Sequence, residues 1–171
     1  MWCSDMTSRR HAIAVLSLAG LSGCGFALRQ PPSFNFQRMH MDGPTNSVLF
    51  QSVLRNLQSV DGLVVTTEAR QREQAQVVLQ LGAELPVKEV TGRTATGAVR
   101  EFNLRLTVNL RVVDQRGIEL LPNTVLSQRR DISFSESAAL SKETEELMLF
   151  AEMRDDLLQQ ILRRLANVKL R

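Results

Sequence analysis

The clearest pattern in the sequence is a strict alternation of apolar and polar residues from Glu101 to Val112. The six apolar positions of this segment are Phe102, Leu104, Leu106, Val108, Leu110 and Val112. Because successive side chains of a β-strand point to opposite faces of its sheet, this period of two predicts a long, half-buried strand. A shift of one residue would expose all of these side chains, so the register of the strand is well defined.

Three further segments are expected to form strands of the same sheet. They span residues 34–41, 76–88 and 124–134, with a shorter candidate at residues 63–66. In the second segment apolar residues again recur at every other position, which indicates a strand with one buried face. Gly82 and Pro86 lie near its far end, so we expect this strand to bend there or to lie at an edge of the sheet.

Two segments instead show the 3.6-residue period of amphipathic helices. In the first, the residues at i, i+3, i+4 and i+7 are Phe50, Val53, Leu54 and Leu57. This helix is expected to run to about Ser59, with Asn46 or Ser47 as its N-cap. The second is expected to begin with Ser141 as its cap and to carry an apolar stripe that only Arg154 interrupts. Its first turn is acidic and its last turn is basic, which complements the helix dipole at both ends.

The order of these elements is β-α-β-β-β-α, which predicts an α+β fold. We expect a two-layer sandwich with one mostly antiparallel sheet of about four strands and the two helices packed on one face. Residues 91–97 and 114–117 are expected to form the turns that join the last three strands. Because the strands alternate instead of being apolar throughout, the second face of the sheet should be exposed to water or to a partner.

The N-terminal segment has the layout of an export signal. Arg9 and Arg10 precede an apolar stretch at residues 12–21. A helix of ten residues spans about 15 Å, half of a hydrocarbon core of about 30 Å, so this stretch is too short to cross a bilayer. Residues 1–23 are therefore predicted to be a signal peptide, with the Sec and twin-arginine routes both open and with Met1 or Met6 as the start.

The sequence Leu-Ser-Gly-Cys at residues 21–24 resembles the bacterial lipobox, in which the thiol is acylated and the chain is cut just before it. Cys24 would then become the lipidated N-terminus, and its acyl chains would tether the protein to a membrane. The alternative is an ordinary signal peptide with a chance cysteine. Gly25 stands where an aspartate would resemble an inner-membrane retention mark, which favours the outer membrane. The predicted mature chain is a lipidated linker at residues 24–33 and a single domain at residues 34–171.

Composition and charge exclude several classes of function. The 171-residue chain carries 21 Lys and Arg among 18 Asp and Glu, a net charge of +3, and it has no tyrosine. Nucleic-acid binding is not expected because no basic cluster is interleaved with aromatic rings. After removal of residues 1–23, His40 is the only histidine and Cys24 the only cysteine. Since the sequence has neither metal-ligand spacing nor a Gly-x-Ser-x-Gly motif, we expect no enzyme, no metal and no cofactor, but a binding or structural role.

Three motifs resemble one family across the whole predicted mature chain. They are Cys-Gly-Phe-Ala-Leu-Arg at residues 24–29, Thr-Val-Asn at 107–109 and Ala-Leu-Ser-Lys at 139–142. Together with the element order, these motifs are similar to the lipopolysaccharide-assembly lipoproteins, the LptE or RlpB family. The resemblance implies an outer-membrane lipoprotein that plugs a large, LptD-like β-barrel, faces the periplasm and the barrel lumen, and helps to place lipopolysaccharide in the outer leaflet. The alternatives are an auxiliary lipoprotein of another envelope transport or barrel-folding complex and, less favoured, a periplasmic enzyme.

The resemblance also implies that two basic positions contact lipid A phosphates. Lys142 matches one position through its Ala-Leu-x-Lys setting, and Arg93 matches the other by its proximity to the hairpin between the two long strands. Lipopolysaccharide is polyanionic, and charge-assisted contacts to phosphate favour Arg and Lys. We therefore expect one basic cluster at an end of the sheet, formed by Lys142, Arg93, Lys88 and Arg100. The alternative is that these residues are scattered, solvated charges.

Overall fold

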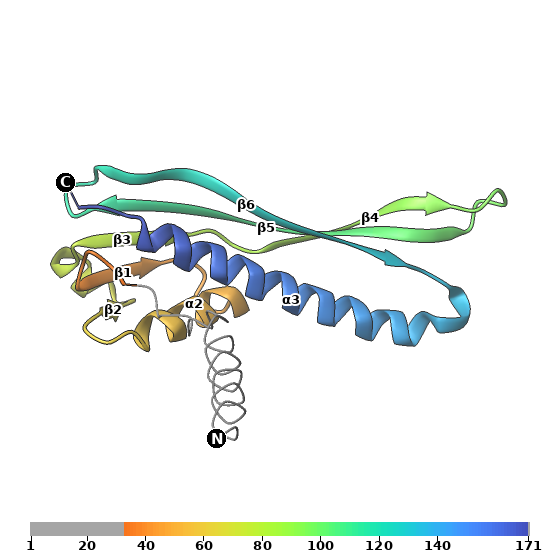
Figure 1. Ribbon diagram of the computed structural model, residues 1–171, viewed down its shortest axis with the longest axis horizontal. Coiled ribbons are helices and arrows are strands. Elements are labelled where there is room, and N and C mark those ends of the chain that lie inside the picture. The colour runs from red at the N-terminus through yellow and green to blue at the C-terminus, as the bar shows by residue number, and fades with distance from the viewer. Residues whose placement is uncertain (1–32, 171) are drawn as a thin grey trace, which may run out of the picture. The chain divides into compact units, whose positions relative to one another are not determined.

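The computed structural model describes residues 33–170 of the chain (Figure 1). The predicted signal peptide, the predicted lipidation site Cys24 and the linker up to residue 32 lie outside the described residues. The strands of the described region are β1 (Arg38–Asp42), β2 (Val64–Thr66), β3 (Val77–Leu81), β4 (Leu85–Arg93), β5 (Val99–Asp114) and β6 (Glu119–Ser133). Its helices are α2 (Val48–Gln58) and α3 (Ala139–Ala166), with short 3-10 segments η2 (Ala69–Gln74) and η3 (Glu136–Ala138).

The strands form one mixed sheet whose two parts are joined by β5. On one side, β6 pairs with β5 in antiparallel register along most of its length. On the other side, β3 pairs with the C-terminal part of β5 and β4 with its N-terminal part. β1 lies beside β3 and runs parallel both to it and to β2. The α+β class is confirmed, but the prediction of about four mostly antiparallel strands was wrong, because the described sheet has six strands and two parallel pairs.

The parallel pairs arise from the connections between the first three strands. α2 connects β1 to β2, and η2 connects β2 to β3. Each connection carries the chain back to the end of the sheet where the preceding strand began, so all three strands run in the same direction. The alternation of apolar and polar residues does not depend on strand direction, and therefore the sequence pattern could not show this arrangement.

The long strand predicted at residues 76–88 is divided in two near Gly82. The Gly82 N–H donates to the Asn109 carbonyl of β5 at 2.8 Å. A Cβ at Gly82 would lie 3.2 Å from the Cβ of Asn109, so the lack of a side chain lets the two backbones approach closely. Beyond this point the chain leaves β1 and continues as β4, which pairs with β5 alone.

The two helices begin at different kinds of cap. The Ser47 hydroxyl accepts a hydrogen bond from the Phe50 N–H at 3.2 Å, so Ser47 is the N-cap of α2, as one of the two predicted candidates. α3 begins at Ala139, and Ala138 stands at its cap position without a side-chain hydrogen bond. The prediction that Ser141 caps this helix was wrong, because the preceding η3 already starts the helical turn and the Ser141 hydroxyl donates to the Ala138 carbonyl instead.

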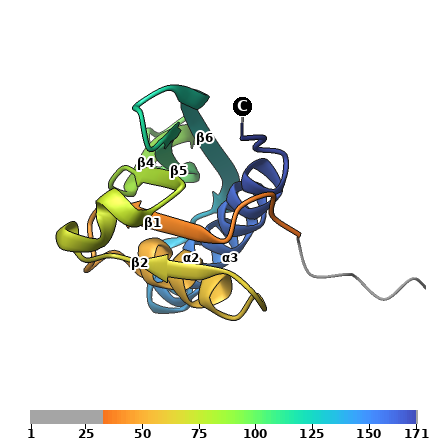
Figure 2. The same cartoon turned by 90° about the vertical axis from the view of Figure 1, so that its left-hand side faces the viewer.

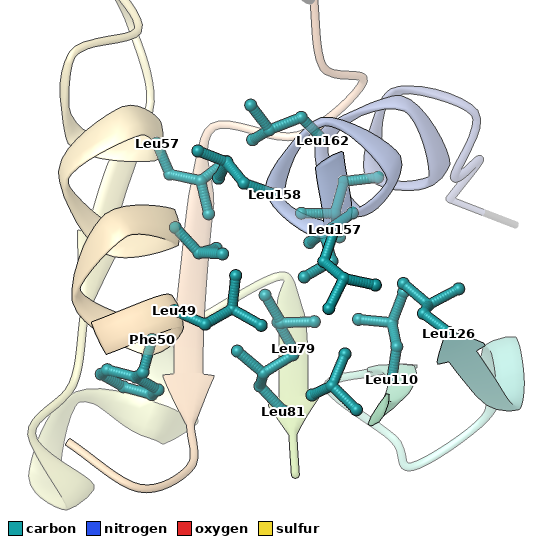
Figure 3. Close-up of a cluster of buried hydrophobic side chains, with 14 of the residues drawn as sticks. Leu49, Phe50, Leu57, Leu79, Leu81, Leu110, Leu126, Leu157, Leu158 and Leu162 are labelled. Carbon is teal, nitrogen blue, oxygen red and sulfur yellow. The ribbon is translucent and has the colours of Figure 1, made fainter. Parts of the chain in front are cut away.

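The main hydrophobic core lies between one face of the sheet and both helices (Figure 3). Leu79 and Leu110 from the sheet and Leu157 from α3 are fully buried there. α2 contributes Leu49 and Leu57, and it packs beside α3 on the same face (Figure 2). This arrangement follows from the two predicted periods, since each strand and each helix presents one apolar side to the same layer.

The second face of the sheet is covered in part. His40, Ala75 and Val78 are buried but do not belong to the main core, because His40 and Val78 alternate with the residues that face the helices. η2 packs against β1 on this side. The expectation of a fully exposed second face was therefore wrong near β1 and β3. Over β4, β5 and β6 the second face carries polar contacts, such as the Asn103 amide donating to the Asp131 carboxylate at 2.7 Å.

Candidate functional site

A small hollow lies between the strands β4 to β6 and the first turns of α3. It has a volume of about 140 Å³. Its lining residues are Lys88, Phe102, Ile132, Ser133, Phe134, Ala139, Lys142, Glu143 and Glu146. Two of the four predicted basic residues, Lys88 and Lys142, thus line the same cavity, which we call the Lys88–Lys142 hollow.

Lys88 reaches this hollow from β4. The register places Lys88 opposite Leu104 of β5, so its side chain points to the face that carries α3. Its Nζ lies 2.5 Å from Glu146 Oε2 and 4.4 Å from the centroid of the Phe102 ring. The ammonium group is therefore held between a carboxylate and an aromatic face, and both contacts favour a cation.

Lys142 enters the hollow from the first turn of α3. Its Nζ donates to Ser133 Oγ at 3.2 Å and to Glu145 Oε2 at 2.7 Å. The contact with Ser133 connects the helix to the end of β6, and Glu145 lies one helical turn away on α3. Both ammonium groups of the hollow thus have partly exposed carboxylate partners, and an anion of higher charge could compete for them.

The other two predicted residues lie further along the β4–β5 hairpin. Arg93 Nη1 donates to the Gly97 carbonyl across the turn at 3.0 Å. Arg93 pairs with Val99 of β5, so the two residues share a face of the sheet. Arg100 follows Val99 directly and therefore points to the opposite face from Arg93. Arg100 lies two residues before Phe102 and shares its face, but neither arginine lines the hollow. The structure therefore brings two of the four residues together, while the lipopolysaccharide contact of all four stays a prediction.

The hollow also contains an aromatic pair that the sequence did not single out. The Phe102 and Phe134 rings pack edge to face with centroids 5.5 Å apart. Phe134 is held beside β5 because its N–H donates to the Arg100 carbonyl at 2.7 Å. These rings give the two lysines an apolar floor, so the hollow could accept a ligand that combines an anion with hydrocarbon. Phe102 continues the apolar face of β5, and this was the one available signal.

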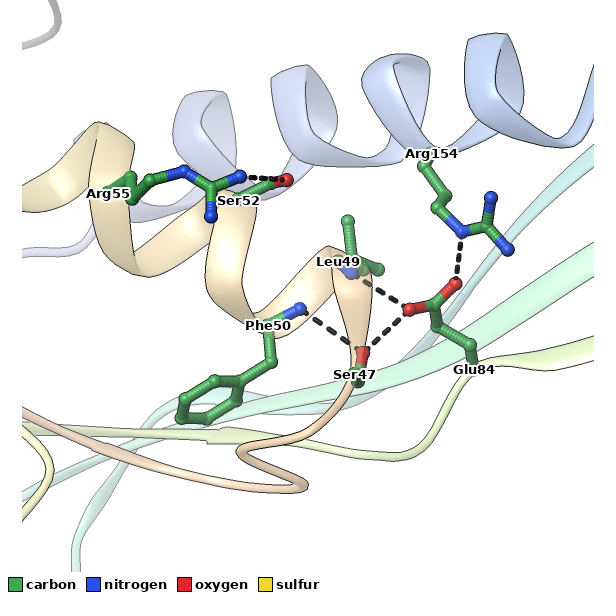
Figure 4. Close-up of polar contacts among 7 residues, drawn as sticks. All are labelled: Ser47, Leu49, Phe50, Ser52, Arg55, Glu84 and Arg154. Atoms are coloured by element: carbon green, nitrogen blue, oxygen red, sulfur yellow. Dashed lines mark hydrogen bonds and ion pairs between the residues drawn. The ribbon is translucent and has the colours of Figure 1, made fainter. Parts of the chain in front are cut away.

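A second polar cluster joins the break between β3 and β4 to both helices (Figure 4). Glu84 Oε1 accepts hydrogen bonds from the Ser47 hydroxyl at 2.6 Å and from the Leu49 N–H at 2.8 Å. Glu84 Oε2 accepts a hydrogen bond from Arg154 Nε at 2.6 Å. Arg154 thus interrupts the apolar stripe of α3 because it is needed to bind a carboxylate at the N-terminus of α2.

The hydrogen bonds of this cluster stabilise the charged form of Glu84. Burial by itself raises the pKa of the Glu84 carboxyl group. The hydrogen bonds from Ser47, Leu49 and Arg154, together with the positive charge of Arg154, outweigh burial and hold this pKa below its ordinary value of 4.5. Glu84 is therefore an ionised structural residue that connects three elements of the domain.

His40, the one histidine of the predicted mature chain, is buried in β1. His40 Nε2 lies 2.9 Å from Asp42 Oδ1, and His40 Nδ1 lies 3.3 Å from Thr66 Oγ1. Asp42 also contacts Arg72 of η2 at 3.1 Å. These contacts fasten η2 and β2 to β1. Across residues 33–170, no group of three His, Cys, Asp or Glu residues could hold a metal ion, and no helix is long and apolar enough to cross a bilayer.

The fold is shared with several bacterial lipoproteins. One is an uncharacterized lipoprotein B from Nitrosomonas europaea, known from a solution structure, with 27% identity, a TM-score of 0.70 and coverage of 83% of this chain and 90% of that chain. The rare lipoprotein B from Shewanella oneidensis shares the fold with 23% identity, a TM-score of 0.63 and coverage of 75% and 93%. A minor lipoprotein from Acinetobacter baumannii shares it with 20% identity, a TM-score of 0.60 and coverage of 78% and 93%.

These three similar structures define the fold class of the chain, and a comparison with protein families identifies one family within it. The family model LptE, described as Lipopolysaccharide-assembly, matches residues 36–165, which is more than half of the chain. The chain therefore belongs to the LptE family of lipopolysaccharide-assembly lipoproteins. This confirms the resemblance drawn from the sequence motifs and places the protein in a non-enzymatic lipoprotein family. No curated protein sequence matches the chain.

Proposed function

We propose that the protein is an outer-membrane lipoprotein, anchored by acyl chains at Cys24, that plugs a large LptD-like β-barrel and helps to insert lipopolysaccharide into the outer leaflet. The observation that carries this proposal is the family match across residues 36–165. The described domain offers support, because the exposed face of β4 to β6 is largely polar, with Leu85 and Val125 as apolar exceptions, and carries paired charges, for example Arg105 with Glu89 at 2.9 Å. The lumen of a β-barrel is itself polar, so such a surface is suited to it.

Direct lipopolysaccharide binding is proposed for the Lys88–Lys142 hollow, with Arg93 and Arg100 as further contacts along the hairpin. The lysines would exchange Glu145 and Glu146 for phosphate oxygens. Such an exchange costs little, since exposed ion pairs contribute only about 0–1 kcal/mol. The two phenylalanine rings would lie against the hydrocarbon next to the phosphate. No metal or cofactor is part of this proposal.

Charge reversal tests direct binding. We expect Lys142→Glu combined with Arg93→Glu to weaken the binding of the purified protein to lipopolysaccharide by about tenfold or more, because each lost charge-assisted contact is worth about 1.5–3 kcal/mol. Surface plasmon resonance on immobilised lipopolysaccharide measures the change. A second variant, Lys88→Glu with Lys142→Glu, separates the hollow from the hairpin.

The matched control is Arg163→Glu with Lys169→Glu, because Arg163 in the last turn of α3 and Lys169 just after the helix are exposed and give the same change in net charge. Equal losses of lipopolysaccharide binding in the control and in the test variants would show that binding depends on net charge and not on these positions. Unchanged binding in both test variants would remove direct contact from the proposal and leave assembly as the function.

The barrel partner is tested by purification of the tagged, lipidated protein from gently solubilised outer membranes. We expect one very large β-barrel protein in a stoichiometric complex. A different envelope transporter or barrel-folding complex in its place would support the alternative function. A protein found alone, or without acyl chains, would contradict the proposed anchor and plug.

A further inference from the structure

The first turns of α3 carry an exposed apolar surface that faces away from the sheet. Its members, which we call the α3 strip, are Leu140, Leu147, Met148 and Ala151. The three large side chains are 82%, 71% and 61% exposed, in the order Leu140, Leu147 and Met148. Isolated exposed leucines are ordinary, but several on one side of one helix form a surface that a partner can bind.

The α3 strip continues an interface that is already formed within the domain. Eleven residues are close to three turns of an α-helix, so Leu147 and Ala151 lie on the same side as Leu158 and Leu162. Those two leucines are only 6% and 8% exposed and lie close to Leu57 of α2 (Figure 3). The same side of α3 is therefore covered in its C-terminal half and open in its N-terminal half.

The point where the cover ends is set by the Glu84 cluster. α2 has 11 residues and α3 has 28, so their lengths are about 16 Å and 42 Å. The cluster holds Ser47, the N-cap of α2, close to Arg154 in the middle of α3. α2 thus starts level with Arg154, and no described element lies beside α3 on this side before that point (Figure 1).

The charges beside the strip restrict what can bind to it. Glu152 and Asp155 are exposed on α3 beside the strip and have no ion-pair partner among the described residues. A polyanionic lipid would be repelled by these carboxylates, whereas a protein surface with Lys or Arg around an apolar centre would complement them. The acidic border thereby distinguishes the strip from the Lys88–Lys142 hollow, where the two lysines reach the surface.

We propose that the α3 strip is the docking surface for the barrel subunit of the complex, through an apolar patch of that subunit bordered by basic residues. The inference rests on the proposed function and adds the surface by which the two proteins hold each other. The strip and the hollow then have separate tasks, one for the protein partner and one for the anionic lipid. Because the strip is exposed in the domain itself, its variants should fold normally.

The experiment is purification of the tagged, lipidated protein from outer membranes with two strip variants. Leu147→Ser with Met148→Ser removes apolar surface, and Glu152→Lys with Asp155→Lys reverses the acidic border. We expect each variant to lower the yield of the co-purified barrel by about tenfold or more, as for the loss of central interface residues. The matched control is Val64→Ser with Ile118→Ser, which removes two exposed aliphatic side chains from β2 and from the turn between β5 and β6, and its barrel yield should be unchanged.

The outcomes separate this inference from the proposed function. A barrel that co-purifies equally with the natural protein and both strip variants would overturn the strip as the docking surface and leave the proposed function intact. No barrel with the natural protein would overturn the proposed function and the barrel as occupant. If a photocrosslinker at Leu147 joined a second copy of this chain, or if the strip variants weakened lipopolysaccharide binding and kept the barrel, the strip would have a different occupant and the inference would fail.

Discussion

The two halves of α3 lie in different surroundings. The C-terminal half stabilises the fold, whereas the N-terminal half carries the proposed binding surfaces. The C-terminal half packs against the sheet on one side and against α2 on another, so Leu157 and Ile161 are fully buried. Among the described residues, the N-terminal half packs against β4 to β6, and its contacts there include the Lys88–Glu146 ion pair and the hydrogen bond from Lys142 to Ser133. The first region holds the fold together, whereas the second presents an open hollow on one side and an open apolar strip on another.

The largest expected difference in stability is between two leucine-to-alanine substitutions, one in each half of α3. We expect Leu157→Ala to lower the free energy of unfolding by about 2–5 kcal/mol, because it leaves a cavity in the main core. Leu147→Ala should change it by less than about 0.5 kcal/mol, because this side chain is already in water. Urea denaturation followed by circular dichroism measures both. Comparable losses would show that the N-terminal half of α3 is packed against something in the isolated protein.

A smaller effect is expected at the junction of the two regions. Glu84→Gln removes the charge that binds Arg154 and the N-terminus of α2, and we expect a loss of about 1–3 kcal/mol in the free energy of unfolding. Glu152→Gln, at an exposed position of α3, is the control and should cost less than about 0.5 kcal/mol. A loss at Glu84 no larger than that of the control would show that α2 is positioned by its apolar contacts alone.

The smallest effect is a pH dependence of this same difference. The pKa of Glu84 is below 4.5 in the folded protein, so the unfolded chain takes up the proton first as the pH falls. The stabilisation by Glu84 is therefore complete above the ordinary pKa and is lost as the pH falls through the lower, folded value. Denaturation from pH 7 to pH 3 should show the natural protein and Glu84→Gln converging below about pH 4.5. A constant difference down to pH 3 would contradict this.

The sequence predicted the elements whose side chains alternate regularly. Residues 101–112 lie within β5, and the apolar stripe beginning near Leu147 lies within α3. The partners of the strands were harder to predict, because a parallel and an antiparallel neighbour require the same alternation. The short strand β2 was predicted as a candidate at residues 63–66, but its parallel pairing with β1 could not be predicted from that local pattern.

The candidate site was predictable to a lesser degree. Lys142 was found through its motif, but its position beside Lys88 depends on the pairing of β4 with β5 and on where α3 crosses them. From the sequence, Arg154 is only an interruption of an apolar stripe. Its ion pair with Glu84 could not be predicted, because Glu84 is far away in the sequence and is brought near by the break after Gly82.

The way β5 joins the two parts of the sheet also affects the order in which the strands form during folding. β4, β5 and β6 follow one another directly and are joined by short turns, whereas β1 must find β3 across the whole of α2, β2 and η2. Contacts between sequence neighbours close small loops and form fast, while distant ones form slowly. We therefore expect the β4–β6 part of the sheet to form before the part that contains β1, and pulse-labelled hydrogen exchange should protect the amides of β5 and β6 ahead of those of β1.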